Sequence, residues 1–278
     1  MKVGVFYPNN NQEHLAVLTA FATGIKRKGV DVEMIPLELY KPVDMAVVFG
    51  VHKKGMPISY PRGRVIREQT AARLPVIVLE KGYVHRREYY AAGFGGLNGR
   101  AFFNNEDSPS DRWEQLKVEL RPPQLNPKGH FLVCGQVPTD ASVQHIDIHK
   151  WTENMCKFIS SHTKNKVIFR PHPLARHITP EIAGVETSSR TLMEDFENCR
   201  AVVTFNSNAA VDAAIEGIPT FAEDKGSMAF SVSANKIAYM QNPVTLKRTQ
   251  WANDLAYTQW TLQEMANGLP WEHLIRKD

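Results

Sequence analysis

Polar residues follow several short apolar runs of this 278-residue sequence. Phe131 to Cys134 leads into a turn with Gln136 and Asp140, and Val167 to Phe169 leads into Arg170-Pro171-His172-Pro173. If these runs are strands of a parallel sheet, the polar residues lie at the carboxyl ends of the strands, where open sheets bind their ligands. They are therefore candidates for a ligand-binding edge.

A third run, Ala201 to Phe205, is followed by Asn206-Ser207-Asn208 at a predicted helix start. Small polar side chains and free backbone N–H groups at such a position favour an anion, and a phosphate fits. Arg170 and His172 can donate to phosphate oxygens, Arg170 through a bidentate fork. A helix cap at Ser207 or an ordinary loop histidine at His172 explains each residue taken alone.

Glu216 ends the same predicted helix, and Gly217 and Pro219 behind it are explained by helix termination. The carboxylate of Glu216 can accept the ribose hydroxyls of a nucleotide or face solvent. The segment from His145 to His149 can bind a metal only as a strand, because alternate residues then share a face. We interpret it as a helix start, and we predict no metal ligands.

In the first half of the chain, the run Val76 to Leu79 ends at Glu80. Basic and aromatic residues surround this point: His52-Lys53-Lys54, Arg62, Arg64, Arg67, Lys81, Tyr83, His85-Arg86-Arg87, Tyr89 and Tyr90. Such a mixture is suited to phosphates and exposed bases. A solvated basic helix face explains it equally well.

Short strands alternate with helical patterns along the chain, as in parallel sheets that helices cover on both faces. We predict an α/β fold with two Rossmann-like doubly wound lobes and a cleft between them. The strands expected in the first lobe are Val3 to Tyr7, Val32 to Ile35, Met45 to Phe49 and Val76 to Leu79, with helices at His14 to Arg27 and Arg62 to Ala72. The second lobe adds a strand at Pro219 to Ala222 and helices at Lys150 to Ser160, Thr191 to Asn198 and Asn208 to Glu216.

Three prolines between Pro122 and Pro127 favour a linker. We therefore expect one lobe over residues 1–120 and a second lobe over 130–249. Residues 250–278 are expected to close on the first lobe, because Gln250 to Met265 reads as an amphipathic helix. The Gly-rich stretch Gly93 to Gly99 interrupts the strand and helix pattern.

The composition, with 43% hydrophobic and 22% charged residues, is that of a globular protein. No apolar run approaches the ~20 residues of a membrane helix, so we expect a cytoplasmic protein, in the host cytoplasm if a phage encodes it. Cys134, Cys156 and Cys199 form no C-x-x-C pair and are expected to be reduced and buried. The net charge of +4 leans only weakly towards anionic partners.

Four segments together resemble bacterial capsule-polysaccharide glycosyltransferases, the Kdo-transferring enzymes among them. They are Glu80 to Arg86, Gly135 to Ser142, Arg170 to Pro173, and Ser207 to Pro219. That family has an E-D-G-F-like turn, a G-Q…D-x-S turn, an H-P motif and a Ser-bearing helix start, in this order. The resemblance spans residues 76 to 222, and Lys81 and Tyr83 depart from it where the family has an acid and a Phe.

The resemblance implies a GT-B-like glycosyltransferase with an acceptor-side lobe over 1–120, a nucleotide-sugar-binding lobe over 130–249, a UDP- or CMP-linked sugar as co-substrate and no cofactor. We expect it to be metal-independent, because the nucleotide-binding lobe has no D-x-D pair to hold a metal. The implied donor site is Gln136, Arg170, His172, Ser207, Asn208 and Glu216, and the implied catalytic carboxylates, facing each other, are Glu80 and Asp140. Because sugar transfer passes through an oxocarbenium-like state, a carboxylate can deprotonate the acceptor hydroxyl or stabilise the anomeric carbon. Cationic and N–H donors neutralise the leaving phosphate.

Two acceptors stay open, with Lys81, Tyr83, Arg86 and Arg87 as the expected acceptor contacts. The interleaved basic and aromatic residues favour a hydroxymethylated pyrimidine in phage DNA, which must be flipped out of the duplex. The alternative is a capsule-type glycan or glycolipid, with the basic residues meeting anionic lipid. A nucleotide-sugar epimerase would share the fold and the phosphate site, and a non-catalytic sugar-nucleotide or DNA-binding module would share only the surface.

Overall fold

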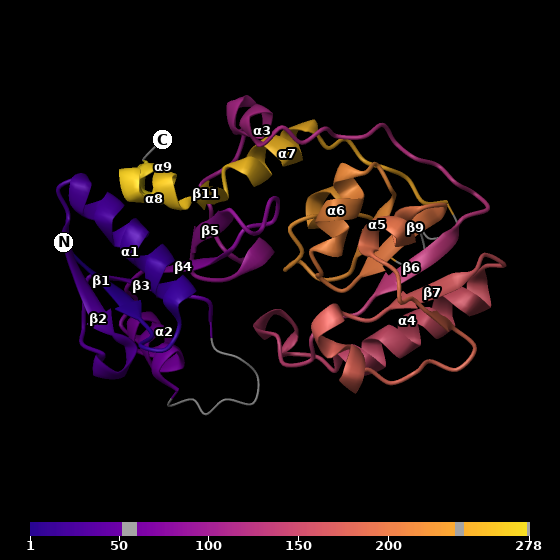
Figure 1. Cartoon of the computed structure of the whole chain (residues 1–278), viewed down its shortest axis with the longest axis horizontal. Helices are drawn as coiled ribbons and strands as arrows, with labels where there is room; N and C mark the ends of the chain where they lie inside the picture. Colours follow the sequence, from indigo (N-terminus) through magenta and orange to yellow (C-terminus); the bar gives the residue numbers. More distant parts are fainter. Residues whose placement is uncertain (52–59, 237–241, 277–278) are drawn as a thin grey trace. The chain divides into compact units, whose positions relative to one another are not determined.

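The computed structural model describes residues 1–51, 60–236 and 242–276. The chain divides into two compact units (Figure 1): unit 1 is Met1–Trp113 with Asn253–Asp278, and unit 2 is Glu114–Ala252. The proline-containing segment expected as a linker is part of unit 2. Its backbone is bound there, because the N–H groups of Arg121 and Gln124 donate to the carbonyl oxygens of Ile215 and Gly217.

Unit 1 contains a six-stranded sheet of order β11-β5-β4-β3-β1-β2. The parallel strands are β1 (Lys2–Tyr7), β2 (Asp31–Pro36), β3 (Met45–Phe49) and β4 (Val76–Lys81), and the antiparallel strands are β5 (Tyr89–Phe94) and β11 (Gln259–Thr261). The four parallel strands are those predicted. Strand β5 was missed because its small residues read as a break, yet a Cβ atom on Gly93 would lie only 2.7 Å from the ring of Phe103.

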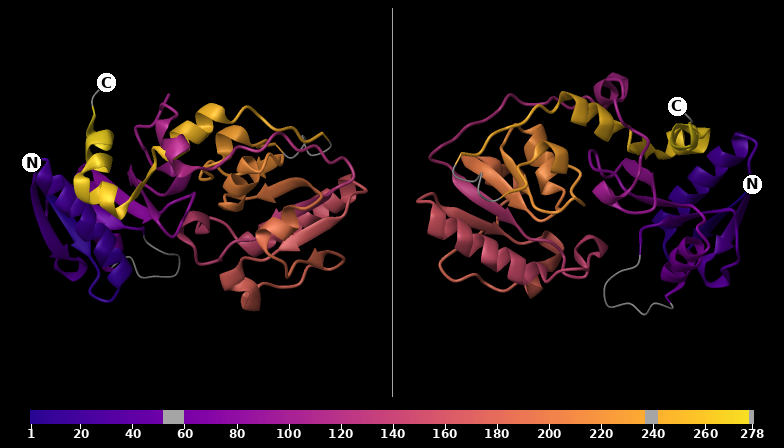
Figure 2. Two further views of the ribbon diagram at one scale, coloured as in Figure 1. Left: turned by 45° about the horizontal axis from the view of Figure 1, so that its top comes forward. Right: turned by 180° about the vertical axis from the view of Figure 1, so that it is seen from behind.

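Helices cover both faces of the unit 1 sheet. α1 (Gln12–Arg27) packs on Val5, Val47 and Leu79, whereas α2 (Pro61–Ala71) packs through Val65 on the opposite face. α8 (Leu262–Asn267) and α9 (Leu269–Ile275) lie beside α1 (Figure 2). The remaining elements are α3 (Asp111–Leu116) and the 3-10 turns η1 (Leu37–Leu39) and η2 (Asn98–Arg100).

The prediction of one helix over residues 250–265 is wrong. The chain forms α7 (Thr249–Ala256), then β11, then α8. A capping box starts α8: the Thr261 side chain accepts from the N–H of Glu264, and the Glu264 carboxylate accepts from the N–H of Thr261. A capping box begins a new helix and does not occur in the middle of one. The Thr261 and Glu264 pair is therefore a sequence signal against a single helix here, although the apolar spacing is that of an amphipathic helix.

Unit 2 contains a parallel sheet of order β10-β9-β6-β7-β8. Its strands are β6 (His130–Cys134), β7 (Val167–Arg170), β8 (Glu186–Thr187), β9 (Cys199–Thr204) and β10 (Thr220–Ala222). Helix α4 (Ile148–His162) covers one face, and α5 (Leu192–Phe196) and α6 (Ala209–Ile215) cover the other (Figure 1). The 3-10 turns are η3 (Ala141–Val143), η4 (Pro173–Ile178) and η5 (Phe230–Val232). The predicted class, α/β with two Rossmann-like lobes, is confirmed.

Burial explains the state of the three cysteines, which are free thiols inside unit 2. Desolvation raises the pKa of Cys156 and that of Cys199 to about 12, and it raises the pKa of Cys134 as well. All three are buried free thiols, as predicted, and they stay protonated at neutral pH. Within the described ranges, no helix has the length and apolar character needed to span a bilayer.

Candidate active site

Three neighbouring strand ends of unit 2 are tied together by side chains. Gln136, which follows β6, donates from Nε2 to Oδ1 of Asn206 after β9 (2.7 Å), and its Oε1 accepts from the N–H of Asn206 (3.1 Å). Asn206 Nδ2 in turn donates to Oδ1 of Asp224 after β10 (2.8 Å). Because Gln136 and Asn206 are also buried, the three strand ends form a rigid polar platform, called the strand-end platform below.

Asp224 was missed by sequence reasoning. The signal that could have found it is the strand-end rule, because Asp224 follows the apolar run Pro219 to Ala222 by two residues. Asp224 Oδ1 also accepts from the N–H of Gly226 (2.9 Å), which fixes the carboxylate. The exposed ring of His145 lies 3.6 Å from Asp224 Oδ2. The segment His145 to His149 is not a strand, because Asp147 caps α4 by accepting from the N–H groups of His149 and Lys150.

The turn that carries Asp140 is attached to this platform. Asn206 Nδ2 donates to the carbonyl oxygen of Ser142 (2.9 Å), and Gln136 Nε2 lies 3.4 Å from Ser142 Oγ. Asp140 itself is exposed, and its Oδ1 accepts from the N–H of Ser142 (2.8 Å). Asp140 thus lies on a turn whose position is set by the buried residues beneath it.

Ser207 and Asn208 lie half-buried at the start of α6, as predicted. Ser207 Oγ accepts from the N–H of Ala209 (3.3 Å), and Asn208 Nδ2 lies 3.5 Å from Asp212 Oδ2. The Ser207 contact is long for a hydrogen bond of its type and holds the hydroxyl weakly, so the hydroxyl can reorient towards a ligand.

Arg170 binds neighbouring protein groups, which differs from the predicted phosphate contact. Its Nη1 donates to Oδ2 of Asp195 and to the carbonyl oxygen of Arg190, both at 2.6 Å. Asp195 is fully buried and also accepts from Arg190 Nε (3.0 Å) and Ser188 Oγ (2.7 Å). Arg170 shares a sheet face with Ile168, so its side chain extends towards α5, which carries Asp195. We revise its role from phosphate contact to support of the turn that follows β7.

His172 lies at the start of η4, and its Nδ1 accepts from the N–H of Leu174 (3.2 Å). In the neutral ring the proton is therefore on Nε2, which is a hydrogen-bond donor. The stiff Pro171-His172-Pro173 sequence fixes the backbone around it. This geometry is compatible with the predicted phosphate contact.

Glu216 is not brought together with the other predicted donor contacts. It caps the C-terminal end of α6, whereas Ser207 and Asn208 lie at the other end of the helix, about 10 Å away for seven residues. Its carbonyl oxygen accepts from Nε2 of Gln124 (2.8 Å). Glu216 therefore lies towards the amino ends of the strands, away from the other donor contacts, and its assignment to the ribose is corrected.

In unit 1, Glu80 lies at the carboxyl end of β4. Its Oε1 accepts from the hydroxyl of Tyr83 (2.7 Å) and from the N–H of Asn98 (2.8 Å). Tyr83 is only 3% exposed, and burial, followed by the charge of Glu80, raises the pKa of its hydroxyl. The prediction that Tyr83 contacts an acceptor is corrected, because its hydroxyl is a buried, protonated donor that positions Glu80.

The predicted basic and aromatic surface is dispersed in the structure. Lys81 forms an ion pair with Glu13 and lies 5.1 Å from the ring centre of Tyr90, which is buried. Arg86 and Arg87 are exposed on the turn after Tyr83, as acceptor contacts require. Of the other members, Arg62 is buried, and His52-Lys53-Lys54 lies outside the described residues.

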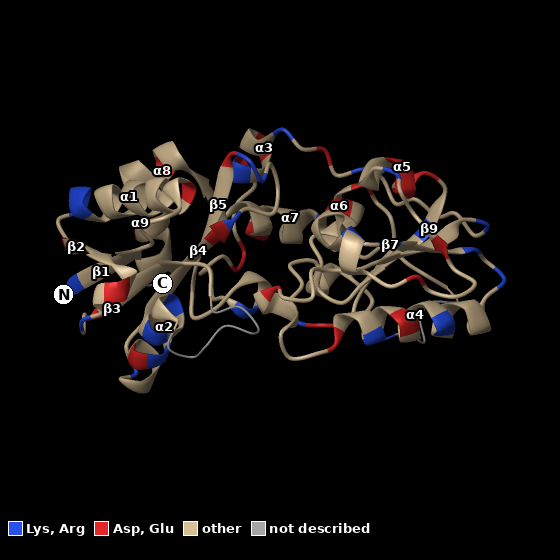
Figure 3. Ribbon diagram, turned by 60° about the horizontal axis from the view of Figure 1, so that its bottom comes forward, with Lys and Arg blue, Asp and Glu red and all other residues tan. Residues whose placement is uncertain are grey.

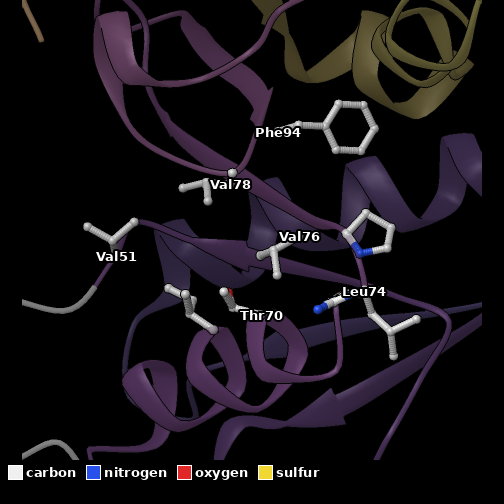
Figure 4. A pocket seen from close by; sticks show the side chains of 10 residues that line it. Val51, Thr70, Leu74, Val76, Val78 and Phe94 are labelled. Carbon is white, nitrogen blue, oxygen red and sulfur yellow. The ribbon is translucent and has the colours of Figure 1, made fainter. Parts of the chain in front are cut away.

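An apolar pocket of about 260 Å³ lies between α2 and β4 (Figure 4). Its lining is Val51, Ile66, Thr70, Arg73, Leu74, Pro75, Val76, Val78, Phe94 and Gly95. Most of these residues surround the amino end of β4, away from Glu80. The pocket offers no set of converging polar groups, so we do not assign it to the site.

Two Rossmann-like units with polar strand ends define a GT-B-like protein. This fold is shared by Thermosulfurimonas dismutans KpsC, a beta Kdo 2,7 transferase, with 15% identity over 97% of this chain and 98% of that chain and a TM-score of 0.57. The fold is also shared by Thermosulfurimonas dismutans KpsC, beta Kdo 2,4 transferase. The identity is 12%, the match covers 93% of this chain and 90% of that chain, and the TM-score is 0.58. No family model matches the chain, and no curated protein sequence is similar to it.

Proposed function

We propose that this chain is a glycosyltransferase that moves a sugar from a UDP- or CMP-linked donor to a hydroxyl of a glycan or glycolipid. The observation that carries the proposal is the strand-end platform of unit 2, with His172, Ser207 and Asn208 on the same edge of the sheet. The proposal is also supported by the fold, which this chain shares with two Kdo transferases.

The donor phosphate is proposed to lie at the carboxyl edge of β7 and β9. His172 Nε2 and the Ser207 hydroxyl donate to its oxygens, together with N–H groups at the start of α6. These donors stabilise the charge that develops on the leaving phosphate, so that the reaction runs without a metal ion. Arg170 acts on this turn through Asp195 rather than on the phosphate.

Glu80 and Asp140 are the proposed catalytic carboxylates. Asp140 is exposed on a turn that the platform positions, which suits a group that must reach a substrate atom. Glu80 is oriented by Tyr83, and its carboxylate is the candidate for proton transfer. Each carboxylate is a candidate either to deprotonate the acceptor hydroxyl or to stabilise the oxocarbenium-like transition state.

A glycan acceptor is supported better than a hydroxymethylated pyrimidine in DNA. Base recognition needs exposed aromatic rings, whereas Tyr83 and Tyr90 are buried and Tyr89 is half-buried. Arg86 and Arg87 remain as exposed cations that can meet an anionic glycan or lipid surface. Duplex-DNA binding that falls steeply with salt, and less steeply in the Arg86→Ala/Arg87→Ala variant, would instead favour DNA.

Thermal shift with a panel of UDP- and CMP-sugars, CMP-Kdo included, tests donor binding, because a ligand of the native state raises its melting temperature. We expect one donor class to bind and His172→Ala to weaken that binding at least ~10-fold, the loss of one charge-assisted hydrogen bond. The control is His177→Ala, an exposed histidine of the same 3-10 turn. The proposal fails if no donor binds, and release of an epimer without acceptor would indicate an epimerase.

A further inference from the structure

Arg62 is a buried cation with no acidic partner among the residues that the structure describes. It lies in the first turn of α2 and is only 9% exposed, yet its Nε has no hydrogen-bond partner and its side chain forms no ion pair with any described residue. Burial lowers the pKa of Arg62, but a guanidinium stays protonated at neutral pH. A charge held in this way is unfavourable for folding unless something else compensates it.

The guanidinium lies at the carboxyl end of β3. Arg62, Val65 and Gln69 form the buried face of α2, and side chains on a helix tilt towards its N-terminus. A Cβ atom built on Gly50, the residue after β3, would lie 3.5 Å from Arg62 Nη1. Gly50 has a φ of +70°, which a glycine adopts without strain, so the backbone passes close to the guanidinium.

The N-terminus of α2 lacks the usual compensation for its positive end. The cap residue Tyr60 makes no side-chain hydrogen bond, Pro61 follows it, and the first turn contains no acid. Arg62, Arg64 and Arg67 follow one another along this helix, whose acid, Glu68, lies beyond the first turn (Figure 3). A helix start of this kind favours a bound anion.

The place in the sheet is one where α/β proteins bind ligands. From β1 the chain proceeds to β2 on one side, and β3 and β4 lie on the other, so the strand order switches between β1 and β3. Phe49 of β3 pairs with Leu79 of β4. Gly50 comes directly after Phe49, and Glu80 comes directly after Leu79. The Arg62 guanidinium and the Glu80 carboxylate therefore belong to one edge of unit 1.

We infer that Arg62 and the start of α2 bind one oxyanion, a carboxylate or a phosphate group of the acceptor. The assignment of this anion to the acceptor rests on the proposed function, whereas the anion site itself does not. The acceptor is thereby an acidic glycan or a phosphorylated one, and its anion is held at the edge of the sheet that carries Glu80.

The first test is anion binding by the full-length protein at constant ionic strength. With a dissociation constant near ~1 mM, 10 mM inorganic phosphate raises the melting temperature of the wild type by about 3 °C, whereas chloride does not. Acetate in a parallel titration distinguishes carboxylate from phosphate. The shift disappears in Arg62→Met and persists in Arg64→Met, which removes an exposed arginine of the same helix.

The melting temperature without added anion separates ligand binding from a structural role. If Arg62 is an uncompensated cation, Arg62→Met is at least as stable as Arg64→Met in chloride buffer. A lower melting temperature of Arg62→Met in that buffer, or a phosphate shift that survives in it, overturns the inference. Phosphate binding through Arg62 without any nucleotide-sugar binding would overturn the proposed function and leave the anion site standing.

A transfer assay tests the assignment to the acceptor. For an acceptor with a carboxylate or phosphate, Arg62→Met raises KM about 10- to 100-fold, as expected for a lost charge-assisted contact, and leaves donor binding unchanged. For the neutral counterpart of that acceptor, KM is the same in both proteins. Equal KM effects on the charged and the neutral acceptor contradict this assignment.

Discussion

Gln259 Oε1 accepts a hydrogen bond from the backbone N–H of Tyr83, 176 residues earlier in the chain (2.7 Å). The same oxygen accepts from the N–H of Val84 (3.0 Å), and Gln259 Nε2 donates to the Val84 carbonyl (3.1 Å). Gln259 is fully buried in β11. The turn that leads from Glu80 to Arg86 is therefore held by the C-terminal segment of the chain.

Replacing Gln259 by Leu removes three buried hydrogen bonds and leaves two N–H groups and a carbonyl unsatisfied. We expect the free energy of unfolding to fall by about 3 kcal/mol, measured by urea denaturation. Gln263→Leu is the control, because Gln263 is exposed on α8 and its side-chain contact is long (3.4 Å). Equal stability of the two variants would show that Gln259 does not brace the turn.

The Asp195 carboxylate forms ion pairs with both Arg170 and Arg190. The Asp195→Asn substitution therefore leaves two positive guanidinium groups near a neutral amide. We expect unit 2 to lose about 3 kcal/mol of stability, the usual effect of removing one partner of a buried ion pair. Glu197→Gln, an exposed acid just beyond α5, is expected to change stability by less than about 0.5 kcal/mol. An Asp195→Asn protein as stable as this control would remove the support role of Arg170.

These contacts mark the limit of what the sequence can predict. The strand ends of β6, β7 and β9 were found because apolar runs and the polar residues after them are local patterns. The hydroxyl of Tyr83 donates to the nearby Glu80, whereas Arg170 Nη1 donates to Asp195, which only tertiary packing brings to it. A side chain's preference for a partner within the protein is not visible in a local pattern, so the sequence assigns both residues to ligands.

His273 gives a test of the fold by pH. Burial lowers its pKa to about 4, and its Nε2 lies 2.9 Å from the carbonyl oxygen of Phe103. The unfolded chain has a histidine pKa of about 6.5, so between pH 6.5 and 4 the unfolded state binds more protons. The free energy of unfolding must then decrease as the pH falls through this range.

His273→Gln removes this titration. The stability difference between wild type and variant is expected to shrink by on the order of 3 kcal/mol from pH 7 to pH 4, measured by urea denaturation at several pH values. The sign is fixed, because a depressed histidine pKa can only cost stability on acidification. Parallel pH profiles of the two proteins would mean that His273 titrates normally in the folded state.

The proposed reaction is tested most directly by measuring the transfer of a labelled sugar to a glycan acceptor. The donor is the nucleotide sugar found to bind, and the rate is compared between wild type and Asp140→Asn. We predict transfer by the wild type and a loss of at least ~10²-fold in turnover for Asp140→Asn, with donor affinity and melting temperature unchanged. Absence of transfer from every donor that binds, or full activity of a normally stable Asp140→Asn protein, would contradict the proposed reaction or its carboxylate.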